Sequence, residues 1–264
     1  MKVTSSLLIS TYNWPEALNL VLKSVLDQTR LPDEILIADD GSREETKVVI
    51  NRYKVLFSIP VKHIWQEDNG FRKSKILNKA IAETDSDYII QIDGDCILHP
   101  KFVSDHLNAA QKGQYLYGSR VNILPKFVTE IFQNGITKFN IFSKEIKNKA
   151  RTLHIPFLAS LYKKHHGISK KFRGCNVSYW RSDFVAVNGY NEDFEGWGRE
   201  DSDLVIRIGN LGVLAKRLRY AGIVYHIHHT VNSKHNFEQN DRMQNQTITN
   251  KTTFIENGIS QYLK

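Results

Sequence analysis

Short apolar segments alternate with segments of helical periodicity in the first 118 residues, and this alternation restricts the fold more than any other feature of the sequence. The apolar runs that predict buried strands occupy residues 3–10, 34–38, 61–65 and 88–92. Apolar residues at helical spacing follow the first of these runs and again the third. Strands that alternate with helices indicate an α/β fold with a largely parallel sheet.

Polar residues stand where the expected strands end. Ligands of parallel α/β sheets gather at the carboxyl ends of the strands, so side chains at those ends are candidates for binding. These candidates are Thr11, Asp39, Asp40, Asp93 and Asp95. Just beyond the first strand, Asn13 is placed to cap the helix that follows.

Two acidic motifs at the strand ends each have two interpretations. Asp93 and Asp95 stand two positions apart on a turn that leaves a buried strand, which suits a hard divalent ion held against a diphosphate. Asp-x-Asp turns without metal are nevertheless common. Asp39 and Asp40 suit the hydrogen-bond donors of a nucleoside, or else form a solubilising turn. Asp93 and Asp95 follow a buried strand one strand and helix beyond Asp39 and Asp40, and this position favours the interpretation as a metal site.

Residues 72–84 predict an amphipathic helix with Arg72, Lys75 and Asn78 near its start. A helix N-terminus attracts phosphate through its free amides and its dipole, and cations there would reinforce the attraction. The alternative is a basic outer face. Because cations in the first turn oppose the helix dipole, that alternative explains them poorly.

The most specific string in the chain is GWGREDSD, residues 196–203. Glycines on both sides of Trp197 allow a ligand to approach the backbone, and an indole can stack on a sugar face. Glu200 and Asp201 can supply a base. The alternative for Asp201 and Asp203 is that acidic residues favour the start of a helix, which leaves the glycines and the tryptophan unexplained.

Three histidines, His226, His228 and His229, fall within four residues near the end of the chain. One of these imidazoles could complete the metal coordination begun by Asp95. A single histidine in a strand usually has a structural role, so both interpretations stay open.

The strand and helix alternation weakens after residue 118, and we place a lobe boundary there, between 1–118 and 119–264. The second lobe predicts a helix over 201–211 and short strands near Leu214 and Val224. We expect the polar residues 232–250 to form a mobile or peripheral segment.

Positive charge is concentrated in residues 126–173, which contain eleven Lys or Arg residues and two acidic residues, a net charge of +9 in a chain of net charge +8. Such a segment suits an anionic membrane surface or a polyanionic glycan, or is simply a solvated face. No apolar run reaches the length of about 18 to 20 residues that a membrane span needs. We therefore expect a cytoplasmic protein, peripheral at the membrane if the basic segment binds it.

The motifs STYN, DDGS, NGFRKSKILNKA, DGD and GWGREDSD together resemble those of family 2 glycosyltransferases of the GT-A fold. The second half of the chain resembles the galactosyltransferase-type region of bacterial chondroitin polymerases and β-1,4-galactosyltransferases. The resemblance implies a Rossmann-like nucleotide-binding sheet with a smaller acceptor-binding lobe. It also implies an enzyme that moves a sugar from a UDP-sugar, with inversion, to a glycan or lipid-linked saccharide, with no nucleic acid partner.

The resemblance also implies roles for single residues. Asp201 would be the catalytic base, with Glu200 and Trp197 holding the acceptor sugar. Asp95 and one of His226 or His229 would bind Mn²⁺ or Mg²⁺. The donor would be held by Thr11, Asn13, Asp39, Asp40, Arg72, Lys75, Asp93 and Gly174.

Two other functions fit parts of the sequence. A sugar-nucleotide pyrophosphorylase uses a similar sheet, but the glycine-rich start of such enzymes is absent from MKVTSSLLISTYN. A basic module that binds a polyanion or glycan without catalysis would explain the charge, but it leaves DGD and GWGRED without a purpose.

Overall fold

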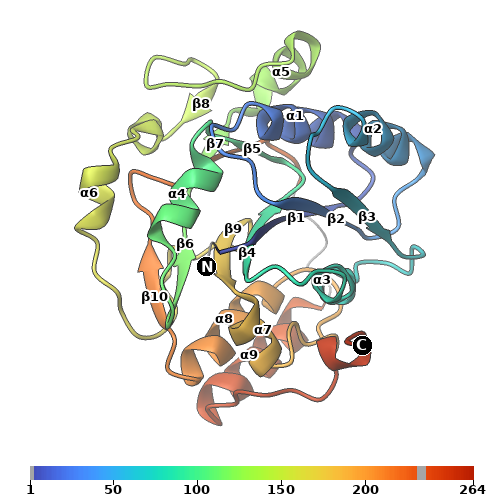
Figure 1. Cartoon of the computed structure of the whole chain (residues 1–264), viewed down its shortest axis with the longest axis vertical. Helices are drawn as coiled ribbons and strands as arrows, with labels where there is room; N and C mark the ends of the chain where they lie inside the picture. The colour runs from blue at the N-terminus through green and yellow to red at the C-terminus, as the bar shows by residue number, and fades with distance from the viewer. Residues whose placement is uncertain (1–2, 231–235) are drawn as a thin grey trace.

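A seven-stranded sheet runs through the computed structural model, which describes residues 3–230 and 236–264 (Figure 1). Across the sheet the strands are β10 (Leu214–Arg217), β6 (Gln114–Tyr117), β9 (Asn176–Trp180), β4 (Tyr88–Asp93), β1 (Ser5–Thr11), β2 (Glu34–Asp39) and β3 (Val61–Trp65). The four strands β4, β1, β2 and β3 are parallel, and β9 runs antiparallel to both of its neighbours. The predicted α/β fold with a largely parallel sheet is confirmed.

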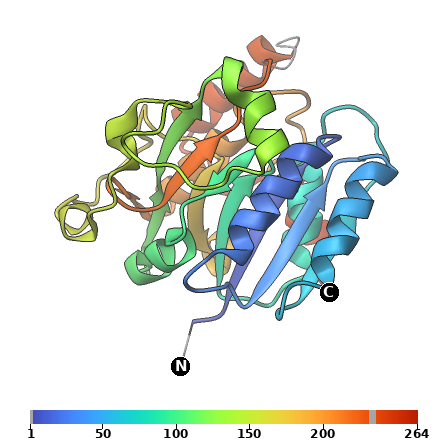
Figure 2. The same cartoon turned by 90° about the horizontal axis from the view of Figure 1, so that it is seen from above.

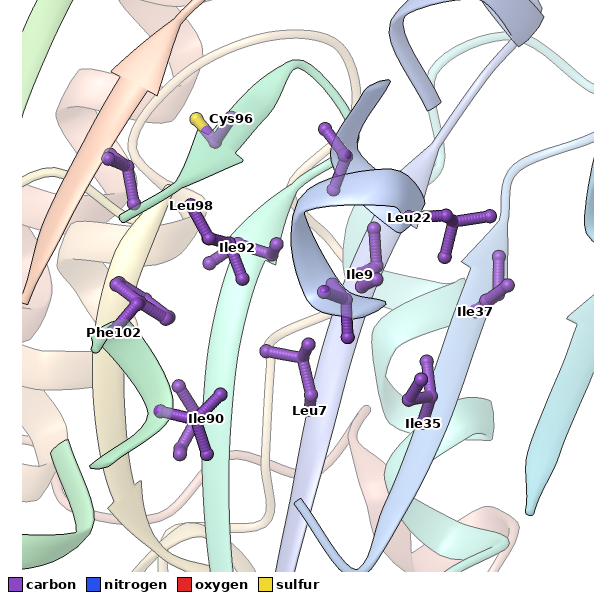
Figure 3. Close-up of a cluster of buried hydrophobic side chains, with 14 of the residues drawn as sticks. Leu7, Ile9, Leu22, Ile35, Ile37, Ile90, Ile92, Cys96, Leu98 and Phe102 are labelled. Atoms are coloured by element: carbon purple, nitrogen blue, oxygen red, sulfur yellow. The ribbon is translucent and has the colours of Figure 1, made fainter. Parts of the chain in front are cut away.

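Helices cover both faces of this sheet, because the central strands are apolar on both sides. On one face lie α1 (Pro15–Leu26) and α2 (Glu44–Lys54), side by side in Figure 2, together with α4 (Phe102–Ala109). On the other face lie α3 (Lys73–Ala82), α7 (Arg181–Ala186) and α8 (Glu200–Asn210). In Figure 3, Leu7 and Ile9 of β1 belong to the same apolar layer as Leu22 of α1. Leu8, between them in the sequence, belongs to the apolar layer on the opposite face of the sheet.

A smaller sheet of four strands stands beside the main one. Its order is β5 (Cys96–Leu98), β11 (Ile223–His226), β7 (Ser119–Ile123) and β8 (Ile146–Lys147). An apolar cluster that includes Ile97, Val121 and Tyr225 joins this sheet to α1 and to α5 (Val128–Asn134). β5 follows β4 after two residues, so the small sheet begins next to the carboxyl end of β4.

Residues on both sides of position 118 build the main sheet, since β9 and β10 come from the second part of the chain. The two parts therefore share one set of apolar layers. The division of the chain into a donor-binding part, 1–118, and an acceptor-binding part, 119–264, stays a prediction.

Of the two interpretations of the polar C-terminal segment, mobile or peripheral, the first is wrong. Residues 237–249 form α9 (Phe237–Thr249), which packs on α8; residues 232–235 lie outside the described part of the chain. The buried side chains of α9 are Asn240, Gln244 and Thr247. The side chain of Asn240 donates to the Gly198 carbonyl at 3.0 Å, and Thr247 donates to Asp203 at 2.7 Å. A helix that buries polar side chains has no apolar stripe for sequence analysis to detect.

The predicted helix cap at Asn13 is also wrong. α1 begins after Trp14, with no side-chain cap, and Asn13 has a positive φ of 46°. Its side-chain oxygen accepts a hydrogen bond from the Arg43 amide at 2.9 Å. Asn13 therefore fixes the loop after β2 rather than the start of α1.

The basic segment 126–173 folds into short elements: η1 (Pro125–Phe127), α5, β8, η2 (Lys149–Thr152) and α6 (Pro156–Ser160). It is fixed to the core by His154, whose Nε2 donates to the Asp105 carboxylate of α4 at 2.9 Å. Among the described residues, no helix combines the length and the apolar character needed to cross a membrane.

Candidate active site

The carboxyl ends of β1, β2 and β4 bring the predicted polar residues to one edge of the main sheet. In the strand register Thr11 lies opposite Asp39, and Ser10 lies opposite Asp93. Gly94 donates its amide to the Ser10 carbonyl at 2.7 Å, and a Cβ at this position would lie 2.9 Å from that oxygen. Only glycine allows the turn between the two aspartates to approach β1 so closely.

Asp95 lies beside two histidines that come from the far end of the chain. The antiparallel pairing of β5 with β11 places His226 opposite Cys96, and the Ile227 amide donates to the Asp95 carbonyl at 2.9 Å. Asp95 Oδ2 consequently lies 3.1 Å from Nε2 of His229 and 3.4 Å from Nε2 of His226. His228, between the two, is exposed and does not join this group.

The donor set of Asp95, His226 and His229 fits a divalent metal ion. The Nδ1–H of His229 donates to the Thr230 carbonyl at 2.7 Å, which leaves Nε2 to face Asp95. Such an orientation by a second hydrogen bond is usual for histidine ligands. One carboxylate and two imidazoles suit a first-row divalent ion. The structure thus brings both alternative histidines to Asp95, where the sequence could not choose between them.

Asp95 and His229 stabilise each other's charged forms. Burial raises the pKa of Asp95, but the hydrogen bond from His229 and the charges of both histidines outweigh it and leave the pKa below its usual value. The hydrogen bond to Asp95 raises the pKa of His229 to about 9, against the effect of burial. Burial lowers the pKa of His226. A cation would take the place that the proton of His229 holds in the free protein.

A second charged cluster surrounds Lys73, the first residue of α3. Its ammonium Nζ lies 3.0 Å from Asp93 Oδ1, 3.3 Å from Asp201 Oδ2 and 3.9 Å from Glu200 Oε1. Burial works against the charge, but Asp201, Asp93 and Glu200 together raise the pKa of Lys73 well above its usual value. Lys73 therefore joins the strand end of β4 to the start of α8.

Asp201 is held by several neighbours at the first turn of α8. Its Oδ1 accepts hydrogen bonds from the Tyr190 hydroxyl at 3.0 Å and from Gln91 Nε2 at 3.4 Å. Gly174 faces its other oxygen, and a Cβ on residue 174 would lie 1.8 Å from Asp201 Oδ2. Gly174 thus makes room for Asp201.

Glu200 is buried next to Asp201 and accepts a hydrogen bond from the Gly198 amide at 3.1 Å. Burial and the charge of Asp201 raise the pKa of Glu200 to about 7. At neutral pH this side chain is poised between its acid and its carboxylate form. The start of α8 therefore offers two adjacent carboxyl groups.

Asp39 and Asp40 are 1% and 7% exposed, so the interpretation as a solubilising turn is wrong. Asp39 accepts hydrogen bonds from the Ser42 amide at 2.8 Å and from His63 Nε2 at 2.9 Å. Asp40 accepts from the Arg72 amide at 2.8 Å and from Gln66 Nε2 at 2.6 Å. Both carboxylates fix the loops around the end of β2.

The remaining candidates lie around this edge. The guanidinium of Arg72 pairs with Glu195 at 2.8 Å. Lys75 is exposed and, with Arg72 and Glu192, lines a polar cavity of about 240 Å³. Trp197 stacks on Phe237 of α9, with ring centroids 6.1 Å apart.

Sequence reasoning missed three side chains of this site: Lys73, Tyr190 and Gln91. The dipole argument applied to Arg72 and Lys75 applies equally to Lys73, so this residue could have been found. Gln91 sits inside a buried strand and Tyr190 in a loop, and no local pattern connects either of them with Asp201.

Comparison with known sequences agrees with this geometry. Residues 6–164 match the profile described as "Glycosyl transferase family 2", and residues 156–230 match "N-terminal domain of galactosyltransferase". Chondroitin synthase from Escherichia coli is 23% identical over 84% of this chain and 34% of its own length. Validoxylamine A glucosyltransferase from Streptomyces hygroscopicus subsp. limoneus is 26% identical over 79% of this chain and 48% of its own length. The chain therefore spans less than half of these relatives.

Comparison with solved structures gives the fold. S. aureus TarS 1–349 in complex with UDP matches with a TM-score of 0.64 and 15% identity, over 99% of this chain and 70% of that one. The mannosyltransferase PcManGT from Pyrobaculum calidifontis, in complex with GDP-Man and Mn²⁺, matches with a TM-score of 0.59 and 14% identity, over 94% and 62%. These likenesses establish the GT-A fold. The family 2 profile matches more than half of the residues of this chain, and the chain therefore belongs to glycosyl transferase family 2.

Proposed function

We propose that this chain is a metal-dependent, inverting glycosyltransferase that moves a sugar from a UDP-sugar to a hydroxyl of a glycan or lipid-linked saccharide. One observation supports the proposal above all. The possible metal ligands Asp95, His226 and His229 stand next to Asp93, which Lys73 connects to Asp201. A site for a diphosphate and a candidate base therefore occur together.

The reaction we propose is a single displacement. Mn²⁺ or Mg²⁺ held by Asp95, His226 and His229 would neutralise the negative charge of the leaving diphosphate. Asp201 would accept the proton of the attacking hydroxyl, and Glu200 with Trp197 would position the acceptor sugar. A positioned base on the acceptor side is what inversion in one step requires.

The donor would bind along the carboxyl ends of β1, β2 and β4. UDP in the complex of TarS and GDP-Man in that of PcManGT support a nucleotide-sugar here. We assign the nucleoside to Thr11, Asn13, Asp39 and Asp40, and the phosphates to the neighbourhood of Asp93, with Arg72, Lys75 and Gly174 at its border. Family membership favours this function over the pyrophosphorylase and over the non-catalytic polyanion-binding module.

A donor screen tests the proposed function. The thermal midpoint of the chain would be measured in Mn²⁺ with a panel of UDP- and GDP-sugars, and donor hydrolysis would be followed in parallel. A true donor stabilises the native state by mass action, so its midpoint should rise with concentration. No shift and no hydrolysis with any nucleotide-sugar would remove the proposed activity.

The affinity for UDP should depend strongly on the metal. Without a cation, Asp93 and Asp95 repel the diphosphate, so we expect UDP binding in Mn²⁺ to exceed that in EDTA by at least about tenfold, on the scale of close charge pairs. Titration calorimetry measures both constants, with Asp95→Asn in Mn²⁺ as a second comparison. Equal affinity in EDTA and in Mn²⁺ would exclude the metal site.

Lipid-linked acceptors would bring the enzyme to a membrane, and the basic segment 126–173 suits that surface. Of its apolar residues, Ile131 and Phe139 are buried in the core and cannot contact a membrane. Phe142, Phe157 and Leu161 instead are 88%, 74% and 61% exposed. Exposed apolar side chains among cations are typical of proteins that bind the anionic surface of the inner leaflet.

Sedimentation with vesicles tests this docking. Binding should rise with the fraction of anionic lipid and fall with salt, because each Lys or Arg near the surface contributes up to about 1 kcal/mol. Changing Lys144, Lys147 and Lys149 to Glu should weaken binding severalfold. The matched control changes Lys47, Arg52 and Lys54 of α2 to Glu. If neither set of substitutions changes vesicle binding, or the wild type does not bind anionic vesicles at low salt, the positive charge serves an acidic acceptor or solubility instead.

A further inference from the structure

Lys73 has more negative charge around it than one ammonium can balance. Its side chain is 12% exposed, and the oxygens of three carboxylates, Asp93, Glu200 and Asp201, lie within 3.9 Å of Nζ. Asp93 belongs to the donor side of the site, and Asp201 is the candidate base. The ammonium therefore stands between the two halves of the proposed reaction.

Both oxygens of Asp201 are occupied in this arrangement. Oδ1 accepts from Tyr190 and Gln91, and Oδ2 accepts from Lys73 at 3.3 Å. Gly174 closes on Oδ2 from another side. Oδ2 keeps a second lone pair, but an ammonium beside a carboxylate makes that carboxylate a weaker base, so Asp201 would take the proton of an acceptor hydroxyl more readily once Lys73 has moved away.

The diphosphate of a bound donor would compete with Asp201 for the ammonium of Lys73. Its diphosphate would enter beside Asp93, which is separated from Asp95 only by Gly94. Phosphate oxygens are strong acceptors for an ammonium, and a lysine has a flexible stem that can redirect its three donors. Lys73 is the first residue of α3, so phosphate there would also face the positive end of the helix dipole.

We propose that Lys73 is a positioning residue that exchanges Asp201 for the donor diphosphate, so that the base is released only when the donor is bound. Tyr190 and Gln91 hold Asp201 in place through Oδ1 after the exchange. The enzyme would thereby avoid an active base in the absence of donor. This inference rests on the proposed function, since it assumes the diphosphate site at Asp93 and Asp95.

Calorimetry with UDP in Mn²⁺ tests the exchange on four proteins: the wild type, Lys73→Met, Asp201→Asn and the double variant. Lys73→Met should weaken UDP binding by about tenfold or more, the scale of a lost charge-assisted hydrogen bond. Asp201→Asn should tighten UDP binding by about three- to tenfold, because Lys73 no longer has to leave that carboxylate. This gain should vanish in the double variant, which has no ammonium to redirect.

Controls separate the exchange from a merely structural role. Lys79→Met, on the same helix, should bind UDP as the wild type does, and Lys73→Arg should restore part of the affinity. The double variant, which loses the ammonium together with one of its three carboxylates, keeps the test usable if Lys73→Met alone does not fold. UDP binding by Lys73→Met at wild-type affinity, or an equal effect of Asp201→Asn with and without Lys73, overturns the inference. Failure of the wild type to bind UDP would instead overturn the proposed function.

Discussion

Replacing Asp201 by Asn should lower the turnover of sugar transfer by about 10²-fold or more, the usual scale for loss of a general base. The amide keeps the shape of the carboxylate, and its oxygen can still accept the hydrogen bond from Tyr190. It cannot accept a proton at neutral pH. Initial rates at saturating donor and acceptor measure the effect, and UDP binding in Mn²⁺ should be at least as tight as in the wild type.

Glu200→Gln is the matched comparison, because Glu200 is the neighbouring carboxyl group and its pKa of about 7 also suits proton transfer. If Asp201 is the base, Glu200→Gln should mainly raise the KM for the acceptor, and its turnover should fall less than that of Asp201→Asn. Near-normal turnover of Asp201→Asn, together with collapse in Glu200→Gln, would assign the base to Glu200.

Asp203→Asn should destabilise the fold by about 3–5 kcal/mol, although it lies only two residues from Asp201. Asp203 and Arg207 are both almost fully buried, and their side chains meet at 2.8 Å within α8. The amide would leave the guanidinium without a counter-charge in the interior. The thermal midpoint should fall by roughly 6 to 20 °C for a chain of this size.

Glu44→Gln on α2 is the control for that change. Glu44 pairs with Lys47 at 3.3 Å, but both side chains are mostly exposed. Water screens such pairs, so the loss should stay below about 0.5 kcal/mol. Similar midpoints for the two variants would mean that the Asp203 and Arg207 pair contributes no more than a surface contact.

The different roles of Asp201 and Asp203 could not be predicted from the sequence. Both are acids in the first turn of one helix, and acids there have a ready explanation in the helix dipole. Two residues correspond to a rotation of about 200° on a helix. Asp203 consequently turns inward to Arg207, and Asp201 turns toward Lys73 and Tyr190. The dipole explanation therefore suffices for neither residue, and only the packing of α8 separates their roles.

The predicted strands agree with the structure because a buried parallel strand is apolar throughout and leaves a continuous run. Asp95, His226 and His229 could be singled out from the sequence because they stand in short clusters of residue types that bind metal ions. Their grouping depends on the pairing of β5 with β11, which joins residues about 130 positions apart. No local pattern encodes such a pairing, so the choice between His226 and His229 could not be made from sequence. α9 was missed because polar contacts, rather than an apolar stripe, hold it on α8.

The position of β9 bears on how this molecule can be made. This strand lies between β4 and β6 in the sheet, although it follows both of them in the sequence. β4 and β6 therefore cannot be joined into one sheet until the chain has been synthesised as far as residue 180. A fragment that stopped at residue 118 would present the unpaired edge of β4, and open sheet edges invite pairing with other chains. Contacts between distant parts of the sequence also slow folding. A fragment limited to residues 1–118 is therefore a poor choice for expression, and tags or fusion partners belong at the termini rather than near residue 118.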